Sequence, residues 1–244
     1  MKLTTDSIYR LDQLIQTAMI AGLKKIIIDG TNKKIRGIDE KQSVVVLTEQ
    51  GVPDIGSYQI AINRPEQLYA RLNLVKASGD LVVDATIAAN NEDISILEIS
   101  AGKTKAQFRC ASVEAVKGVP KSINDTHVWQ VKVKGKLISV VAQGAAAMGS
   151  DTITIASKDG QTVSFECVED KSKDIFTTDL EDAPLWIGSG TAATSFCRKY
   201  PTKTLLALLK EAAKTDDTVS MQIGDGGILS LKVNKLDFSV IPAQ

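Results

Sequence analysis

The chain has 244 residues, of which 43% are hydrophobic and 24% are charged, as in an ordinary water-soluble protein with one large core or two modest ones. Lys and Arg number 29, and so do Asp and Glu, so the formal net charge is zero and no overall field indicates nucleic acid as a partner. The first residues lack the apolar run of a signal peptide, and no stretch approaches the ~18 apolar residues of a membrane span. We therefore expect a cytoplasmic protein.

The first predicted element is a helix over residues 5–22, with Thr5 as a possible N-cap and Gly22 as its stop. β-branched runs at 25–28 and 43–47, separated by turn sequences, predict antiparallel strands. The apolar positions at helical spacing in the first helix are Ile8, Leu11, Leu14, Ile15, Ala18 and Met19.

A second helix is predicted from Pro65, because proline is favoured at a first helical position. It carries Leu68, Leu72 and Val75 on one face, and a Ser-Gly-Asp break ends it at residue 80. Strands are expected around residues 81–87, 94–99 and 106–111.

The second half repeats this order. A strand at 128–133 precedes an apolar helical face made by Leu137, Val140, Val141, Gly144 and Met148, and strands follow at 152–156 and 163–167. A last helix, opened by Tyr200-Pro201, carries Leu205, Leu208, Leu209 and Ala212, and Gly224 to Gly227 fits a hairpin turn. Two copies of helix–strands–helix–strands use the whole chain, which favours an internal duplication.

We predict an N-terminal domain at 1–111, an interdomain connector at 112–127 and a C-terminal domain at 128–244. Gly118 and Pro120 interrupt both periodicities in the connector. Its apolar residues, Val113, Val116, Val119 and Ile123, either anchor it to its own domain or line a docking groove.

Residues suited to catalysis are sparse. His127, the single histidine, has no Cys or His nearby, which excludes most zinc spacings and argues against Ser-His chemistry. Cys110, Cys167 and Cys197 are far apart and outside any CxxC, so we expect reduced thiols that serve packing. The GxGxxA match from Gly188 to Ala193 is set aside, because a strand and not a helix is expected after it. We expect no enzyme activity, metal or cofactor.

Charge is unevenly distributed between the helices and the rest of the chain. Helical segments assigned as 4–22, 63–76, 134–149 and 198–214 carry net charges of −1, +2, +2 and +4. Because the whole chain has a net charge of zero, the residues outside these segments carry an equal negative charge. Lysines on solvated helix faces give one explanation. The other is a surface that contacts the phosphates of duplex DNA without reading sequence, since no aromatic residues accompany the lysines for stacking on single strands. The candidate DNA-facing residues are Arg10, Arg64, Arg71, Lys76, Lys134, Lys136, Arg198, Lys199, Lys203, Lys210 and Lys214.

The pattern resembles the two-domain DNA sliding clamps, which include the proliferating cell nuclear antigen and the clamps of T4-like phages. The resemblance lies in the stretches 161–178, 195–200 and 236–244 of the second domain and in Ile35 to Glu40 of the first. It covers nearly the whole chain, but as pattern and order with few invariant motifs. It implies an α+β clamp (processivity) fold, with two similar domains, each with two helices packed on antiparallel sheets, in a closed ring of three subunits around DNA. One departure is the first helix, which has few basic residues.

The resemblance also implies a subunit interface and a partner pocket. The interface would pair an edge strand at 105–111 with one at 174–179, where Phe108, Cys110, Ile175 and Phe176 lie and where an unpaired edge invites a partner. The pocket beneath the connector would receive a short anchor peptide. By position it comprises Ile38, Val44, Val119, Ile123, Val240, Ile241 and Pro242, although Val240 and Ile241 could equally be ordinary strand core.

The function implied is a processivity factor that tethers a DNA polymerase to duplex DNA, with a clamp-loader ATPase as a further partner and the host cytoplasm as its location if the source is viral. Two alternatives stay open. One is a β-rich phage assembly protein whose duplicated domain serves oligomerisation. The other is a monomeric clamp-like factor that binds DNA by charge.

Overall fold

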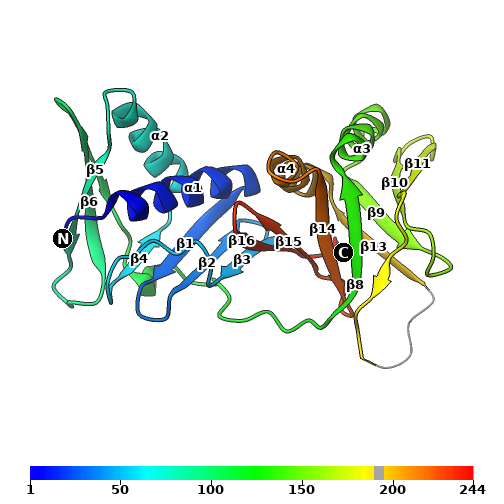
Figure 1. Cartoon of the computed structure of the whole chain (residues 1–244), viewed down its shortest axis with the longest axis horizontal. Helices are drawn as coiled ribbons and strands as arrows, with labels where there is room; N and C mark the ends of the chain where they lie inside the picture. The colour runs from blue at the N-terminus through cyan, green and yellow to red at the C-terminus, as the bar shows by residue number, and fades with distance from the viewer. Residues whose placement is uncertain (190–194, 244) are drawn as a thin grey trace. The chain divides into compact units, whose positions relative to one another are not determined.

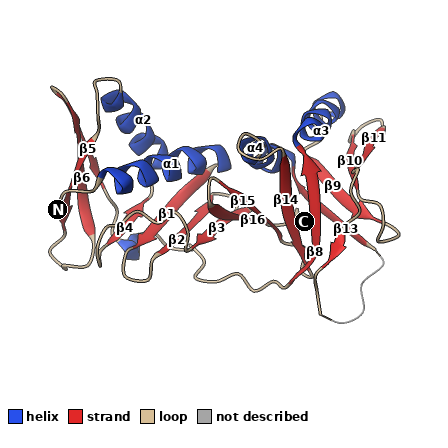
Figure 2. Cartoon of the chain, in the orientation of Figure 1, coloured by secondary structure: helices blue, strands red, loops and turns tan. Residues whose placement is uncertain are grey.

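The computed structural model describes residues 1–189 and 195–243 of the chain. It divides into two units, Met1–Ile123 and Asn124–Gln244. Each unit contains two helices and two antiparallel sheets (Figure 2). No helix among the described residues is long and apolar enough to cross a membrane.

Unit 1 runs helix, four strands, helix, three strands, and ends in a short 3-10 helix, η1 (Figure 1). Strands β3-β2-β1-β4 form one sheet and β5-β6-β7 the other. Isolated bridges from Gln59 to Asp93 and from Ala61 to Ala111 connect the two sheets at β4. The elements are α1 (Thr5–Ala21), β1 (Leu23–Asp29), β2 (Lys34–Asp39), β3 (Val44–Thr48), β4 (Gln59–Ile62), α2 (Pro65–Lys76), β5 (Val82–Ile87), β6 (Ile94–Ala101), β7 (Thr104–Arg109) and η1 (Val113–Ala115).

Unit 2 repeats this order, with two additions. Strand β8 comes before the first helix, and the short β12 lies between the third and fourth strands of the repeat. One sheet has the order β11-β10-β9-β13, and β12-β8-β14-β15-β16 are neighbours in the other. The elements are β8 (His127–Lys134), α3 (Gly135–Met148), β9 (Thr152–Ser157), β10 (Ser164–Val168), β11 (Ile175–Asp179), β12 (Leu185–Trp186), β13 (Phe196–Pro201), α4 (Thr202–Ala212), β14 (Thr218–Gly224), β15 (Leu229–Val233) and β16 (Leu236–Val240).

Helix α1 follows the predicted pattern closely. Ile8, Leu11 and Ala18 are among its buried residues, and Gly22 ends it in the left-handed conformation, with φ 72°. The N-cap is Thr4 and not Thr5, because the Thr4 side chain accepts a hydrogen bond from the Ser7 backbone N–H at 3.2 Å.

Two assignments in unit 2 require correction. Arg198 and Lys199 lie on strand β13, opposite Ile155 and Thr154 of β9, and α4 begins only at Thr202. The strand expected before Pro201 is therefore confirmed, and the helical segment counted from residue 198 began too early. Pro201 occupies the extended N-cap position of α4. In α3 the buried face runs through Ile138, Val141 and Ala145, whereas Val140 is 42% exposed. Apolar residues occur at both phases of this helix, so periodicity alone could not choose the face.

Candidate functional site

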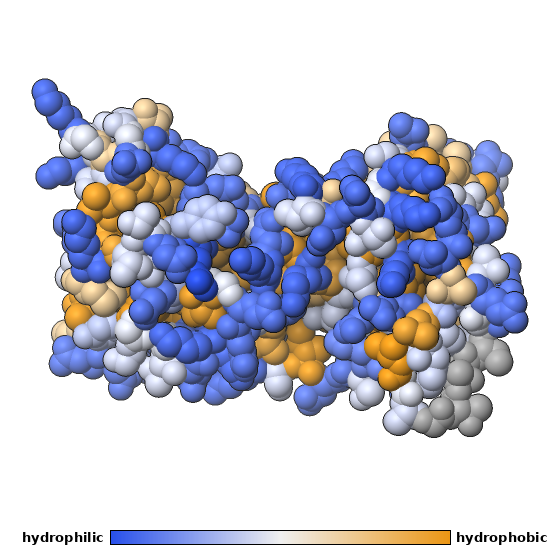
Figure 3. All heavy atoms as spheres, in the orientation of Figure 1, coloured by the Kyte–Doolittle hydropathy of each residue, from blue (hydrophilic) through white to orange (hydrophobic). Residues whose placement is uncertain are grey.

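Helix α4 presents an exposed basic stripe. Lys203 and Lys210 are seven residues apart, so they share a helix face, and the opposite face is buried through Leu205, Leu208 and Leu209. Neither lysine makes an ion pair within the described part of the chain. Hydrophilic residues cover α4 where it is in view (Figure 3). These two ammonium groups are therefore available to an anion from outside the chain.

Lys214, which follows α4, is partly neutralised because its Nζ lies 2.6 Å from Glu211 Oε2.

The lysines at the start of α3 share one carboxylate. Lys134 and Lys136 both pair with Glu181, with Lys136 Nζ 3.0 Å from Oε1. The hydrogen bonds from Lys134 and Lys136, together with their charges, lower the pKa of Glu181, and the hydrogen bond to Glu181 raises the pKa of Lys134. Because all three groups are exposed, this cluster is screened by solvent and could exchange Glu181 for another anion.

The cations of unit 1 are more heavily engaged within the protein. Arg10 pairs with Asp6 at 2.7 Å, and Lys76 Nζ lies 2.6 Å from the carboxylate of Asp12, which is buried. Arg10 and Lys76 therefore each have a carboxylate partner within unit 1, which Lys203 and Lys210 of α4 lack in the described part of the chain.

Arg64 and Arg71 lie over the ring of Phe108, with their Cζ atoms 5.6 Å and 5.7 Å from its centroid. Phe108 lies on the strand predicted for the subunit interface, but it is only 1% exposed, so its side chain belongs to the core of its own unit. Arg64 also donates to the Arg109 carbonyl oxygen at 3.0 Å.

Arg198 is likewise engaged inside unit 2. Its guanidinium donates to the carbonyl oxygens of Cys197 and Asp225, at 3.0 Å and 3.2 Å. With Lys199, it lies on a strand and is separate from the basic face of α4.

Strand β7 has one open edge. Among the described residues it pairs with β6 alone. The Cys110 N–H donates to the Ser95 carbonyl oxygen at 2.9 Å, and from that bond the antiparallel alternation directs the N–H groups of Lys105, Gln107 and Arg109 away from β6. Lys105 and Gln107 thus offer backbone donors and acceptors to another strand.

Strand β11 is open in the same way, because within the described ranges it pairs only with β10. Bonds from Glu169 N–H to Asp174 O and from Leu180 N–H to Val163 O fix the alternation, so the backbone groups of Ile175, Thr177 and Asp179 point outward.

Ile175 is 63% exposed. The ring of Phe176 instead packs beside Gly144 of α3, where an added Cβ would come within 2.3 Å of it.

The first part of the connector is anchored to unit 1. Val116 is buried with Ile27 and Ala61, and Val113 and Val119 pack against that cluster. Lys25 Nζ donates to the Lys117 carbonyl oxygen at 2.8 Å. The apolar residues of this segment therefore hold the connector down, as the first of the two interpretations expected.

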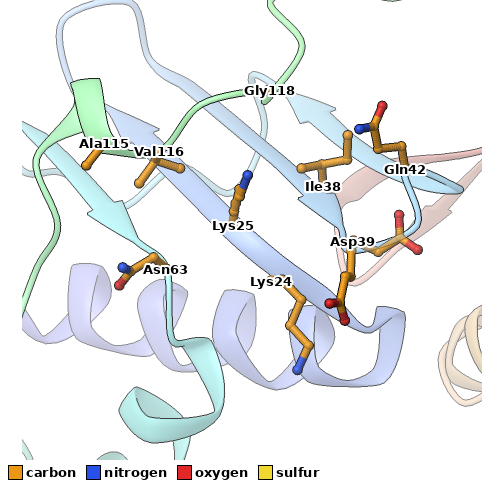
Figure 4. A pocket seen from close by; sticks show the side chains of 10 residues that line it. Lys24, Lys25, Ile38, Asp39, Gln42, Asn63, Ala115, Val116 and Gly118 are labelled. Carbon is orange, nitrogen blue, oxygen red and sulfur yellow. The ribbon is translucent and has the colours of Figure 1, made fainter.

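The predicted pocket residues of unit 1 do not share one surface. Ile38 pairs with Val45 and lies on the connector side of the sheet, where it lines a groove with Val116 (Figure 4). Val44 points to the other face and is fully buried, so it cannot touch a partner on the connector side. Val119 and Ile123 are half-buried.

In unit 2, Val240 is fully buried as the last residue of β16, and Ile241 and Pro242 are half-buried beyond it. The Ala243 N–H donates to the Lys199 carbonyl oxygen at 2.8 Å and holds this terminal segment on β13. Burial gives Val240 the role of strand core, which leaves Ile241 and Pro242 accessible.

Asp125 has a role that the sequence did not indicate. Its two carboxylate oxygens accept from the backbone N–H groups of Gly226 and Ile228, each at 2.8 Å, and so close the predicted hairpin turn between β14 and β15. His127 begins β8, and its Nε2 lies 2.9 Å from Ser230 Oγ. The last residues of the connector are therefore part of unit 2.

The described residues contain no group of His, Cys, Asp and Glu side chains that could hold a metal ion. Cys167 is buried, Cys110 is half-buried and Cys197 is exposed, so the exposed one is not a packing residue. Of the GxGxxA match, residues 190–193 lie outside the described residues.

The sequence matches no protein-family model and no curated protein. Solved structures share the fold over nearly the whole length of both chains. PCNA from Entamoeba histolytica has a TM-score of 0.66 at 12% identity, covering 100% of this chain and 98% of that chain. A PCNA2–PCNA3 complex from Sulfolobus tokodaii gives 0.61 at 16%, covering 99% of each. A. fulgidus PCNA bound to the C-terminal region of FEN-1 gives 0.64 at 13%, covering 100% and 97%. The chain therefore has the clamp fold of PCNA, which confirms the predicted α+β clamp fold of the chain.

Proposed function

We propose that this chain is a subunit of a DNA sliding clamp, a non-enzymatic ring that encircles duplex DNA and keeps a DNA polymerase on its template. The observation that carries the proposal is the clamp fold over essentially the whole chain. The uncompensated Lys203 and Lys210 on α4 and the two open strand edges support it.

The DNA contact would be electrostatic and interchangeable. Ammonium groups on helices meet phosphates that repeat along the duplex, so one contact replaces another as the ring moves. Affinity for each phosphate stays low while enclosure provides the long residence.

Ring closure would pair β7 of one copy with β11 of the next. The two surfaces differ, so the contact is heterologous, and three such contacts are proposed to close the ring. Lys105 and Arg109 make β7 basic, whereas Asp179 makes β11 acidic, so opposite charges would meet across the joint.

Partner proteins would bind beside the connector. The A. fulgidus relative was solved with the C-terminal region of FEN-1 bound, which supports recognition of short terminal segments by this fold. We propose a polymerase and a loader ATPase as partners, with Ile38, Val119, Ile123, Ile241 and Pro242 as the accessible contact residues.

Light scattering tests the ring. We expect a mass near three times 26.2 kDa. A monomer at every concentration would instead favour a clamp-like factor that binds DNA without closing.

Primer extension with the cognate polymerase and loader tests the function, on circular and on linear templates. The clamp should lengthen the products made on the circle, because a ring cannot slide off it. Equal product lengths with and without the protein on the circle would contradict the proposal.

A further inference from the structure

The connector lies on the face of strands β1 and β2 that carries Ile27, and a groove runs along each side of it. Ile27 is directly opposite Arg36, and Asp29 is opposite Lys34, so these four side chains share the face on which Val116 packs. Strands form the floor of each groove, and the connector forms a wall.

One of these grooves, with a volume of about 680 Å³, is rich in cations, and we call it the basic groove. This volume lies within the ~300–1,000 Å³ of typical ligand sites. Its charged lining residues are Lys34, Arg36, Lys117, Lys121, Asp29 and Glu114, and its apolar ones include Ile27, Val113, Val116 and Val119.

Of the two carboxylates that line this groove, Asp29 and Glu114, Asp29 is already engaged within the protein. Asp29 accepts from the backbone N–H and the side-chain amide of Asn32, both at 2.9 Å. Burial alone would raise the pKa of Asp29, but the hydrogen bonds from Asn32 and the charge of Arg36 together lower it, so the group stays a carboxylate whose acceptors are in use.

Lys34 pairs with Glu49 at 3.0 Å, outside the groove lining. Arg36, Lys117 and Lys121 make no ion pair with any carboxylate in the described part of the chain. Three cations thus face the groove without a bonded counter-charge.

The groove on the other side of the connector provides an internal comparison. It is lined by Lys24 and Lys25 but also by Asp39 and Glu40, so its charges balance (Figure 4). Lys25 is held by the connector, and Lys24 Nζ lies 4.0 Å from Glu66. The excess of positive charge is specific to the basic groove.

We propose that the basic groove binds an acidic peptide segment of a partner protein. Its carboxylates would pair with Arg36, Lys117 and Lys121, and its apolar side chains would contact Val113 and Val119. Such a segment would lie across the face of the sheet, because β4 is already bridged to Asp93 and Ala111 and offers no open edge for strand addition.

The lining argues against nucleic acid as the occupant. It contains no aromatic residue on which a base could stack. Asp29 and Glu114 would also face consecutive phosphates, whereas a peptide can space its carboxylates to avoid them. Peptide binding needs neither DNA nor a closed ring. The peptide could therefore fail to bind while the proposed clamp function holds, and it could bind even if the clamp function is wrong.

The test is fluorescence anisotropy of the full chain with a labelled peptide of alternating glutamate and leucine, at low salt. Lys117→Glu with Lys121→Glu should raise Kd by roughly tenfold or more, since both side chains are exposed and charge-assisted contacts are lost. Lys24→Glu, in the balanced groove, should change Kd less than about twofold. A glutamine-for-glutamate peptide should bind far more weakly.

Three results would overturn the inference: no binding of the acidic peptide, an equal loss from Lys24→Glu, or displacement of the peptide by single-stranded oligothymidylate at lower concentration than by unlabelled peptide. The exposed position of the connector lysines keeps folding intact, which circular dichroism checks, and Arg36→Gln provides a second variant within the groove.

Discussion

Gly144 shows how a single side chain sets the packing of a helix on a sheet. A methyl group there would come within 2.3 Å of the Phe176 ring, including 2.6 Å from its Cγ, which cannot move without shifting the strand. Glycine is unfavourable inside a helix by ~1 kcal/mol relative to alanine, so its presence in α3 is explained by this close approach.

We expect Gly144→Ala to destabilise the protein by about 1–3 kcal/mol, because overpacking outweighs the gain in helix propensity. Gly135→Ala in the same helix is the matched control, since its Cβ would meet no atom closer than 3.7 Å. Urea unfolding followed by circular dichroism compares the two. Equal stability of both variants would show that α3 can move away from Phe176.

Thiol reactivity should separate the three cysteines. Burial raises the pKa of Cys110 to about 12, with Asp93 adding to the rise and Arg64 opposing it, and burial also raises the pKa of Cys167. Both therefore stay protonated and unreactive near pH 8, whereas Cys197 is exposed.

Iodoacetamide at pH 8 should therefore modify Cys197 first in the native protein and all three only after unfolding, as measured by mass spectrometry of peptides. Labelling of Cys110 at a rate equal to that of Cys197 would contradict its burial.

Among the secondary-structure elements, α4 carries two exposed lysines, Lys203 and Lys210, that have no carboxylate partner in the described part of the chain. Lys203→Glu with Lys210→Glu should weaken binding to a short linear duplex. The plot of log affinity against log salt falls less steeply when phosphate contacts are lost, so its slope should become less negative by roughly 0.9 per lost contact. Anisotropy titrations at several salt concentrations measure this. The control is Lys158→Glu with Lys171→Glu, which makes the same charge change at exposed lysines outside the helices. An equal effect of both pairs would remove α4 from the interface.

The open edge of β7 gives a second prediction. Gln107→Pro deletes an outward N–H without breaking a β6 bond, so it should lower the assembled mass while leaving the fold intact, as proline is tolerated at edges. Gln107→Ala keeps that N–H and should assemble normally. Light scattering over a dilution series distinguishes them, and a ring that survives the proline would exclude β7 from the joint.

The elements with strong periodicity were predictable, and the short ones were not. Helices α1 and α2 and the buried face of α4 follow from the spacing of residues such as Leu68 and Leu205. Strand β4, the two-residue β12 and η1 were missed, because these elements are too short to show a hydrophobic periodicity. Arg198 and Lys199 were counted with the last helix although a strand was also expected before Pro201, and their pairing with β9 decides for the strand.

The site was less predictable than the fold because it depends on partners distant in sequence. Nothing local to Arg64 or Arg71 reveals that Phe108 lies beneath them, or that Asp12 holds Lys76. The basic groove was missed too. Lys34 and Arg36 are two residues apart, so their side chains lie on the same face of a strand, and this spacing could have indicated a basic face. Its remaining cations come from the connector, whose path only the structure gives.

For the whole molecule, enclosure makes a prediction that charge alone does not. Once loaded on circular duplex DNA, the protein should stay bound in salt that abolishes its binding to short linear DNA, because release requires a joint to open and not a phosphate contact to break. Gel filtration of loaded circles, before and after a single restriction cut, measures this. Loss from the uncut circle in high salt would mean that no ring had closed.

The two open edges also have a consequence for the proposed assembly of many copies. If β7 of one copy joins β11 of the next, every open oligomer still ends in one unsatisfied strand of each kind, whatever its length. Subunits could therefore be added without limit, and a closed ring forms only if the rotation between neighbouring subunits brings the last subunit back to the first. A substitution that turns this angle without weakening the pairing should yield filaments and not monomers, visible as turbidity that rises with concentration.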